Sequence, residues 1–348
     1  MLGDRMALPK IVSLFSGAGG LDLGYRDAGF ALAFAVDSSE WAIKTHKRNF
    51  KNSTSIAADL IDLQPAGVLE KLADVLTDGE PIGVIGGPPC QGFSRANPAA
   101  LASDPRNKLP ILYLEIVEEL QKRYDVRFVL FENVLGIKDV KHEIAFKGIL
   151  AKFKQLGFAE RVDEYCALDF EVPQNRKRVI ISAFKSLAAG SAFSPEKKPR
   201  KNLDVRAAIG GFPEPVYFAR GLTAADIPYH PNHWTMQPVS KRFSDPDKTM
   251  TSTRSFRRLS WDDPSPTVAY GHREIHVHPD GHRRLSIYEA MRLQGFPPEF
   301  VLEGPLSAQV EQVSNAVPPP LAQALAEATI RALAEADTAS RVDDERVA

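Results

Sequence analysis

The chain has 348 residues, of which 44% are hydrophobic and 25% charged, and its formal net charge is −1. These values are typical of a globular protein of about two domains, and they exclude a largely disordered chain, a coiled coil and a collagen-like fibre. No apolar run approaches the length of a membrane helix. Two cysteines, Cys90 and Cys166, are too few for a disulfide framework, which favours a reducing cytoplasm.

The first half of the chain alternates strand-like and helix-like segments. Short apolar runs predict strands at residues 11–15, 31–36, 55–58, 82–85 and 127–131. Helices are expected up to about residue 28, over residues 38–50 and over residues 109–123. Such β-α units predict an α/β fold with a doubly wound, mostly parallel sheet covered by helices on both faces. Ligands bind these sheets at the carboxyl ends of the strands, so the loops there are the candidate sites.

The second half differs in composition. Of the 26 prolines, 17 lie after residue 180, and six of the eight histidines lie within residues 230–282. Proline, glycine and charged residues interrupt every apolar run over residues 186–282, which predicts a smaller, irregular domain. Helical spacing returns over residues 286–293 and 320–334. We therefore expect a catalytic domain over residues 1–185, a second domain over 186–282, and a segment over 283–348 that returns to the first.

Glycine-rich and acidic residues follow the first three predicted strands. Residues 15–20 read FSGAGG, a strand-to-helix turn at which glycines let a ligand approach the helix N–H groups. The spacing does not fit the dinucleotide-binding pattern, and a simple tight turn remains an alternative. Asp37 and Asp59 end the second and third strands, where a carboxylate can hold ribose hydroxyls or an adenine amine, or cap a helix. Together these loops outline a pocket of adenosine size.

The loop after the fourth strand is the most distinctive feature of the sequence. Residues 86–94 read GGPPCQGFS, in which glycines and prolines fix the backbone directly before Cys90. A structural cysteine normally lies within an apolar segment, as Cys166 does, so this loop favours a nucleophile. Glu132 ends the fifth strand and is expected to share the pocket as an acid, with a helix cap or a surface charge as the alternative.

Polar residues alternate just before an apolar strand at residues 179–184. Gln174, Arg176 and Arg178 point to one face of this extended segment. Such a face is either a binding surface or a solvated edge, and the sequence leaves both interpretations open.

Six motifs of this sequence resemble those of the bacterial cytosine-5 DNA methyltransferases. Residues 15–20 resemble the loop that binds S-adenosyl-L-methionine (AdoMet) in that family, and residues 86–94 resemble its catalytic Pro-Cys loop. The other matches follow in the order of the family: 131–134 (FENV), 174–178 (QNRKR), 284–297 (RLS to QGFP) and 314–318 (SNAVP). They span nearly the whole chain, from Phe15 to Pro318, and the catalytic loop is highly specific.

The resemblance implies an AdoMet-dependent methyltransferase (Rossmann-like) sheet and the activity of a DNA (cytosine-5-)-methyltransferase. Cys90 would add to carbon 6 of a flipped cytosine so that carbon 5 can attack the methyl group, while Glu132 holds ring nitrogen 3. Arg178 is expected at the base oxygen and Arg176 at a phosphate. The resemblance also implies cofactor-binding roles for Phe15, Gly17, Gly19, Gly20, Asp37, Asp59, Pro88 and Asn315.

The resemblance places a target-recognition domain in residues 186–282, in which we can read no base code. Its basic residues predict a DNA-facing side, although interleaved acidic residues keep a solvated face as the alternative: Lys241, Arg242, Lys248, Arg254, Arg257 and Arg258, followed by Arg273, Arg283 and Arg284. DNA contacts are expected from Gln91, Ser94, Arg254, Arg257 and Arg258. No metal is expected, because no cysteine lies near the clustered histidines of this region. Phosphate or base contacts are favoured for these histidines, which are His272, His276, His278 and His282.

One residue departs from the pattern: Asp37 stands where the family usually has glutamate, and either can bind a ribose diol. A tRNA cytosine-5 methyltransferase shares the motifs, but the full second domain favours double-stranded DNA. A catalytically silent DNA-binding protein would be expected to lack Cys90 or Glu132, and an AdoMet enzyme for small molecules would not need the Pro-Pro-Cys loop.

The biological setting is less specified by the sequence. The resemblance leaves open a restriction-modification system, with a cognate restriction endonuclease acting on the same site without direct contact, or a solitary methylase. The protein is expected to act as a monomer in the cytoplasm, at the nucleoid.

Overall fold

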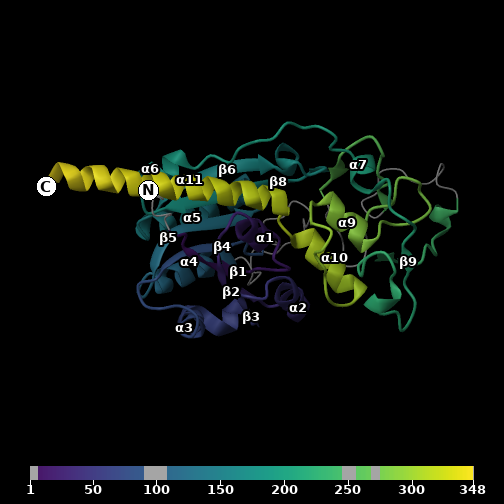
Figure 1. Ribbon diagram of the computed structural model, residues 1–348, viewed down its shortest axis with the longest axis horizontal. Coiled ribbons are helices and arrows are strands. Elements are labelled where there is room, and N and C mark those ends of the chain that lie inside the picture. The colour runs from purple at the N-terminus through teal and green to yellow at the C-terminus, as the bar shows by residue number, and fades with distance from the viewer. Residues whose placement is uncertain (1–6, 90–107, 245–255, 268–274, 348) are drawn as a thin grey trace, which may run out of the picture.

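A computed structural model describes residues 7–89, 108–244, 256–267 and 275–347 (Figure 1). A seven-stranded sheet with its helices occupies one side of the molecule, and an irregular region lies beside it (Figure 1). No helix within the described residues is long and apolar enough to cross a membrane.

The central sheet confirms the predicted α/β class. Its strands run in the order β3-β2-β1-β4-β5-β8-β6. Strands β1 to β5 pair in parallel, whereas β8 runs antiparallel to both of its neighbours, β5 and β6. The start of β8 therefore lies at the same edge as the carboxyl ends of the parallel strands. The strands are β1 (Lys10–Leu14), β2 (Leu32–Asp37), β3 (Thr54–Ala57), β4 (Pro81–Gly86), β5 (Asp125–Asn133), β6 (Ala159–Cys166) and β8 (Lys177–Phe184).

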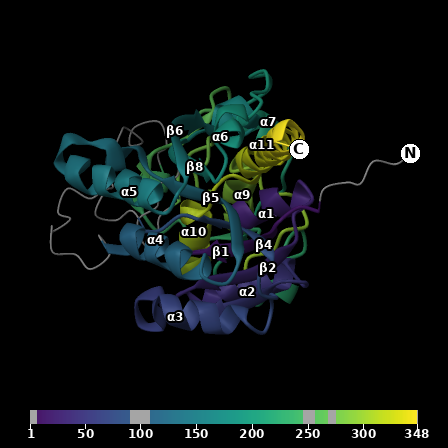
Figure 2. The same ribbon diagram turned by 90° about the vertical axis from the view of Figure 1, so that its left-hand side faces the viewer.

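Alternating side chains along the strands build a separate hydrophobic core on each face of the sheet. Ile11 and Leu130 belong to one core, whereas their neighbours Val12 and Val129 belong to the other. Figure 2 shows helices on both sides of the sheet. The first face carries α1 (Gly20–Asp27), α6 (Leu187–Ala192) and α11 (Pro319–Val347). The second face carries α3 (Leu60–Leu72), α4 (Leu109–Leu120) and α5 (Glu143–Gln155). Helix α2 (Glu40–Asn49) lies beside β2 and β3.

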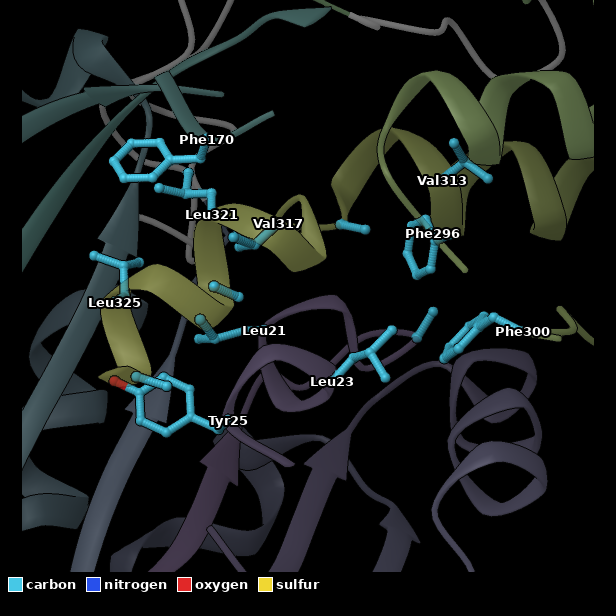
Figure 3. Close-up of a cluster of buried hydrophobic side chains, with 14 of the residues drawn as sticks. Leu21, Leu23, Tyr25, Phe170, Phe296, Phe300, Val313, Val317, Leu321 and Leu325 are labelled. Atoms are coloured by element: carbon cyan, nitrogen blue, oxygen red, sulfur yellow. The ribbon is translucent and has the colours of Figure 1, made fainter. Parts of the chain in front are cut away.

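Helix α11 closes the first core by packing along α1 (Figure 3). Leu21 and Tyr25 of α1 lie beside α11 in this cluster (Figure 3), and the Tyr25 hydroxyl lies 3.2 Å from Thr329 Oγ1. Gly24 permits the close approach of the two helices, because a Cβ atom there would lie 2.3 Å from the backbone nitrogen of Gln323. Segments from the two ends of the chain thus share one core.

The irregular region has little regular secondary structure, as its composition predicts. Its elements are α7 (Val205–Ile209), the parallel pair β9 (Val216–Tyr217) and β10 (Trp234–Thr235), and β11 (Ser265–Pro266). Strand β11 pairs with β7 (Gln174–Asn175), which precedes β8, so the region is tied to the sheet. The described residues also contain short 3-10 helices: η2 (Leu135–Lys138), η3 (Val140–His142), η4 (Ala167–Phe170), η5 (Ala224–Asp226) and η6 (Lys241–Phe243).

Two helices connect the irregular region back to the sheet. Helix α9 (Ile287–Leu293) begins with a reciprocal cap, in which the Ser286 side chain accepts from the Glu289 N–H and the Glu289 carboxylate accepts from the Ser286 N–H. Helix α10 (Leu306–Asn315) follows and leads into α11. Figure 1 shows α10 between the sheet and the irregular region.

Candidate active site

A cavity of ≈ 390 Å³ lies at the carboxyl ends of the parallel strands. This volume is in the range of about 300–1,000 Å³ that is typical of small-molecule sites. The loops after β1 to β5 line the cavity, together with the start of β8 and the end of α10. Ten of the expected site residues lie on its wall: Phe15, Gly17, Gly20, Asp37, Asp59, Pro88, Glu132, Arg176, Arg178 and Asn315.

The glycine loop and Asp37 form one hydrogen-bonded unit of the cavity wall. The N–H group of Gly17 donates to Asp37 Oδ2 over 2.9 Å, and the N–H group of Ser39 donates to Oδ1 over 2.8 Å. Phe15 and Gly17 both have a φ of 54° in the left-handed region, which Phe15 adopts at a cost in backbone strain. Burial raises the pKa of Asp37 above 3.8, although the two N–H groups partly oppose this shift.

Gly19 does not line the cavity, so its expected contact with the cofactor is not supported. Its φ of 90° makes it the left-handed cap of α1, and a Cβ atom there would lie 2.4 Å from the Phe50 ring. Gly19 is therefore required for the turn and for packing against Phe50. Gly20 does line the cavity, where a Cβ atom would lie 2.4 Å from the carbonyl oxygen of Val317.

Asp59 caps α3, which confirms the helix-cap alternative, and it also lines the cavity, where its cofactor role stays a prediction. One carboxylate oxygen accepts from the N–H group of Ile61 over 2.8 Å and caps α3. The same side chain is exposed and lines the cavity. The capping bond fixes the carboxylate at the cavity wall.

Glu132 and Arg178 form an ion pair on the wall of the cavity. Arg178 Nε lies 2.8 Å from Glu132 Oε1, and both side chains are largely buried. Gly87 is close to the carboxylate, because a Cβ atom there would lie 2.6 Å from Glu132 Oε2. The neighbouring Asn133 donates from Nδ2 to the carbonyl oxygen of Pro88 over 3.3 Å. A base entering the cavity would thus meet a cation and a carboxylate held by adjacent strands.

The face formed by Gln174, Arg176 and Arg178 points inward, so it is not a solvated edge. All three residues are buried, whereas Asn175 and Lys177 between them are exposed. Arg176 is only 1% exposed, and its Nη2 donates to the carbonyl oxygen of Ser314 over 3.0 Å. The expected phosphate contact does not suit this buried position. Arg176 instead joins the start of β8 to the end of α10.

Cys90, the predicted nucleophile, lies outside the described residues, as do Gln91, Ser94 and Arg254. Pro88 and Pro89, which directly precede Cys90 in the chain, line the cavity. Cys166, the other cysteine, is buried as expected.

Part of the expected basic surface is interior. Arg283 is 4% exposed and pairs with Glu289 and Glu214, and the buried Arg284 guanidinium lies 4.7 Å from the centre of the Phe256 ring. These two residues were expected on the DNA-facing side, but both are buried within the fold. Arg257 is exposed, and Arg258 is half-buried and donates to the carbonyl oxygen of Pro279.

The described histidines of the second half are likewise packed inside, except for the exposed His282. Burial lowers the pKa of His276 to about 4, and nearby Arg257 contributes to this. Burial also lowers the pKa of His278, which lies beside Arg283. Both rings are neutral near pH 7, so the phosphate contacts expected of them are not supported. Among the described residues, no three His, Cys, Asp or Glu side chains cluster as a metal site.

Helix α10 contributes cavity residues that the sequence did not predict. Ala308, Glu311, Gln312 and Ser314 line the cavity beside Asn315. The apolar spacing of Leu306, Val310 and Val313 is the signal that predicts a helix here, although it is short.

Comparison with known proteins assigns this architecture. A family model described as C-5 cytosine-specific DNA methylase matches residues 9–331. The chain belongs to this family. The methylase is 34% identical to the type II methyltransferase M.MthTI of Methanothermobacter thermautotrophicus, over 91% of this chain and 95% of the relative. It is 32% identical to the type II methyltransferase M1.HphI of Haemophilus parahaemolyticus, over 92% and 86% of the two chains.

Solved structures agree with this assignment. A prophage-encoded protein of E. coli, described as a DNA modification methyltransferase, superposes with a TM-score of 0.70 at 25% identity, covering 95% of the methylase and 100% of that chain. A DNMT2 variant of Spodoptera frugiperda shares the fold with a TM-score of 0.62 at 17% identity, covering 92% and 99% of the two chains. The methylase is thus a DNA (cytosine-5-)-methyltransferase with the fold of its family.

Proposed function

We propose that this methylase transfers a methyl group from AdoMet to carbon 5 of a cytosine that is flipped out of a short specific DNA sequence. The observation that carries the proposal is the Glu132–Arg178 ion pair, which shares one cavity with Asp37, Asp59 and the glycine loop. One cavity thus offers polar groups for both a base and an adenosine.

The cofactor roles rest on the donor set of the cavity. Asp37 has the position and the orientation to accept hydrogen bonds from ribose hydroxyls, and Asp59 presents a carboxylate to the adenine amine. Phe15 offers a ring to the adenine. The rest of the AdoMet molecule is assigned to the part of the cavity lined by Gly17, Gly20, Pro88 and Asn315. These residues fit AdoMet, which supplies an activated methyl group when it is bound.

The chemical roles follow from the reactivity of cytosine. Carbon 5 is a poor nucleophile until the Cys90 thiolate adds to carbon 6, which makes an enamine in the ring. Glu132 hydrogen-bonds or protonates ring nitrogen 3, and Arg178 holds the base oxygen. Once carbon 5 has taken the methyl group, loss of the carbon 5 proton expels Cys90 and restores the aromatic ring. The residue that takes this proton is not assigned.

The cytosine is buried in a duplex and has to leave the stack to reach Cys90. We assign DNA binding to the domain over residues 186–282, apart from α6 at its start, which packs on the sheet. Arg254, Arg257 and Arg258 are assigned to the DNA backbone, and Gln91 and Ser94 to a position beside the extruded base. The first domain, over residues 1–185, and the segment over 283–348 carry catalysis. One flipped base needs one active site, so a monomer suffices.

The relatives supply the biological setting of the proposal. Several are type II methyltransferases, the modification half of restriction-modification systems. A cognate restriction endonuclease that acts on the same DNA site is therefore the proposed counterpart, with no direct contact between the two proteins. Such a protein works at the nucleoid in the cytoplasm.

Bisulfite sequencing of DNA from cells that express the protein tests this proposal. Methylated cytosines are expected in one short recurring motif, and Cys90→Ala is expected to abolish them. Cys166→Ala is the matched control, because it replaces the other cysteine, which is buried away from the cavity. Unmethylated DNA from cells that contain folded wild-type protein would overturn the proposal, and bisulfite sequencing of tRNA would then test an RNA substrate.

A further inference from the structure

Helix α10 is contacted by every part of the molecule. From the sheet side, Thr45 Oγ1 of α2 donates to Gln312 Oε1 over 2.6 Å. From the start of β8, Arg176 donates to the carbonyl oxygen of Ser314. From the end of α9, Gln294 Nε2 donates to the carbonyl oxygens of Val313 and Ala316 over 2.8 and 2.7 Å. The position of α10 is therefore specified by all of its surroundings together.

Gln309 makes the side-chain hydrogen bonds that the described residues show between α10 and the irregular region. Gln309 Oε1 accepts from Trp234 Nε1 over 2.8 Å and from Asn232 Nδ2 over 2.9 Å. Its Nε2 donates to the carbonyl oxygen of Gly304 over 2.8 Å. Gln309 is 5% exposed, and Trp234 and Asn232 are buried as well. A buried amide with three such partners holds one orientation, because each lost bond would leave a polar group buried without a partner.

An adjacent side of α10 faces the cavity. Ala308, Glu311, Gln312 and Asn315 line it, whereas Gln309 does not. A ligand that fills the cavity would contact these residues, and a ligand-dependent shift of α10 would move Gln309 relative to Trp234. One rigid helix thus has the cavity on one side and the irregular region on an adjacent side.

We propose that Gln309 is a positioning residue through which an adenosyl ligand in the cavity orders the irregular region for binding of target DNA. This inference rests on the proposed function, because it takes AdoMet as the ligand of the cavity and residues 186–282 as the DNA-binding domain. Gln309 touches neither ligand, so it affects their mutual coupling rather than the affinity of either one alone. By linkage, the DNA strengthens binding of the cofactor by the same factor.

The test measures the dissociation constant of a duplex that carries the motif found by bisulfite sequencing, with and without saturating S-adenosylhomocysteine. In the wild type, the cofactor product is expected to tighten DNA binding at least about fivefold, a typical coupling. In Gln309→Met, which keeps the volume but removes the acceptor and the donor, this ratio is expected to fall to near one. The affinity for S-adenosylhomocysteine alone, measured by calorimetry, is expected to stay within about threefold.

Two further variants separate coupling from stability. Trp234→Phe removes the donor from the other side of the same contact, so it is expected to reduce the ratio as Gln309→Met does, with no additional loss in the double variant. Thr235→Val is the matched control, because it deletes the buried bond from Thr235 Oγ1 to the carbonyl oxygen of Leu285 in the same strand without touching α10. It is expected to retain the wild-type ratio.

The outcomes distinguish this inference from the proposed function. A wild-type ratio of one, or a Gln309→Met protein with the wild-type ratio, would overturn the role of Gln309. So would an equal loss of coupling in Thr235→Val, because general loosening of the region would then explain all three variants. Failure of the wild type to bind S-adenosylhomocysteine at all would overturn the assignment of the cavity instead.

Discussion

Arg178 Nε lies 2.8 Å from Glu132 Oε1, and the two side chains are only 10% and 11% exposed. They come from strands that run in opposite directions, since Glu132 ends β5 and Arg178 begins β8. Each side chain neutralises the other in a poorly solvated place, so neither charge is buried without a counter-charge. A neutral polar base can therefore form hydrogen bonds with both groups, because the ion pair already balances its own charges.

Glu132→Gln tests the chemical role of this pair. The amide keeps the shape of the side chain but cannot donate a proton as a carboxylic acid, so the single-turnover rate of methyl transfer is expected to fall about 10²–10⁴-fold. The dissociation constant for S-adenosylhomocysteine is expected to change less than about threefold. Rapid-quench assays and calorimetry measure the two quantities, and a parallel loss of both would assign Glu132 to cofactor binding instead.

The raised pKa of Asp37 gives the cavity a pH dependence. Burial raises this pKa above 3.8, so protonation reaches the folded protein at a higher pH than the unfolded chain. The free energy of unfolding of the ligand-free protein is therefore expected to fall as the pH rises from the pKa of Asp37 in the unfolded chain to its higher pKa in the folded protein. Binding of S-adenosylhomocysteine needs the ionised acceptor, so its affinity is expected to rise over the same range.

Asp37→Asn is the comparison for this titration. It is expected to weaken binding of S-adenosylhomocysteine and to remove the pH dependence attributed to Asp37. Calorimetric titrations between pH 4 and pH 8, together with thermal melts of the free protein, measure both effects. A variant that binds with the wild-type pH profile would show that another group titrates.

Gly24→Ala and Gly148→Ala separate tight packing from helix propensity. Both glycines lie inside helices, α1 and α5. A Cβ atom at Gly148 meets nothing within 4 Å, so alanine is expected to stabilise the protein by about 0.5–1 kcal/mol. A Cβ atom at Gly24 lies 2.3 Å from the backbone of α11, so alanine there is expected to destabilise by about 1–3 kcal/mol. Chemical denaturation checks the signs, and equal effects at the two sites would contradict the close helix contact.

Arg257→Ala and Arg283→Ala distinguish surface arginines from buried ones. Arg257 is exposed, so its loss is expected to weaken DNA binding and to reduce the slope of log affinity against log salt by about 0.9. Arg283 is buried and pairs with the buried Glu289, so its loss is expected to cost about 3–5 kcal/mol of stability by leaving that carboxylate without its cation. Fluorescence anisotropy over a salt series and denaturation curves measure the two effects. A changed salt slope at full stability in Arg283→Ala would place that residue at the DNA.

The features that depend on local chain chemistry could be predicted from the sequence. Apolar runs placed β1 to β5 correctly, and turn chemistry placed Asp37 and Glu132 at the edge of the sheet where the cavity lies. Alternation along the segment before β8 correctly put Arg176 and Arg178 on one side, but it could not say that this side is interior. That outcome depends on β8 running antiparallel, which brings its start to the carboxyl ends of its neighbours.

The features that depend on distant partners could not be predicted. Arginine is usually a surface residue, but Arg283 is buried and pairs with Glu214 and Glu289. Helix α10 buries Gln309 and Gln312 as well as apolar residues, so its hydrophobic pattern is weak. Gly19 lies among residues that do line the cavity, and only the position of Phe50 shows that it faces away. In each case the deciding contact comes from residues remote in the sequence.

The cavity wall joins residues 15–22 with residues 308–317, close to opposite ends of the sequence. During translation, Asp37, Cys90, Glu132 and Arg178 all leave the ribosome well before α10 does. The nascent chain therefore carries its full set of reactive groups while the wall that completes the cavity is still missing. A nascent chain that has not yet reached α10 lacks part of the cavity wall, so we expect it to be inactive.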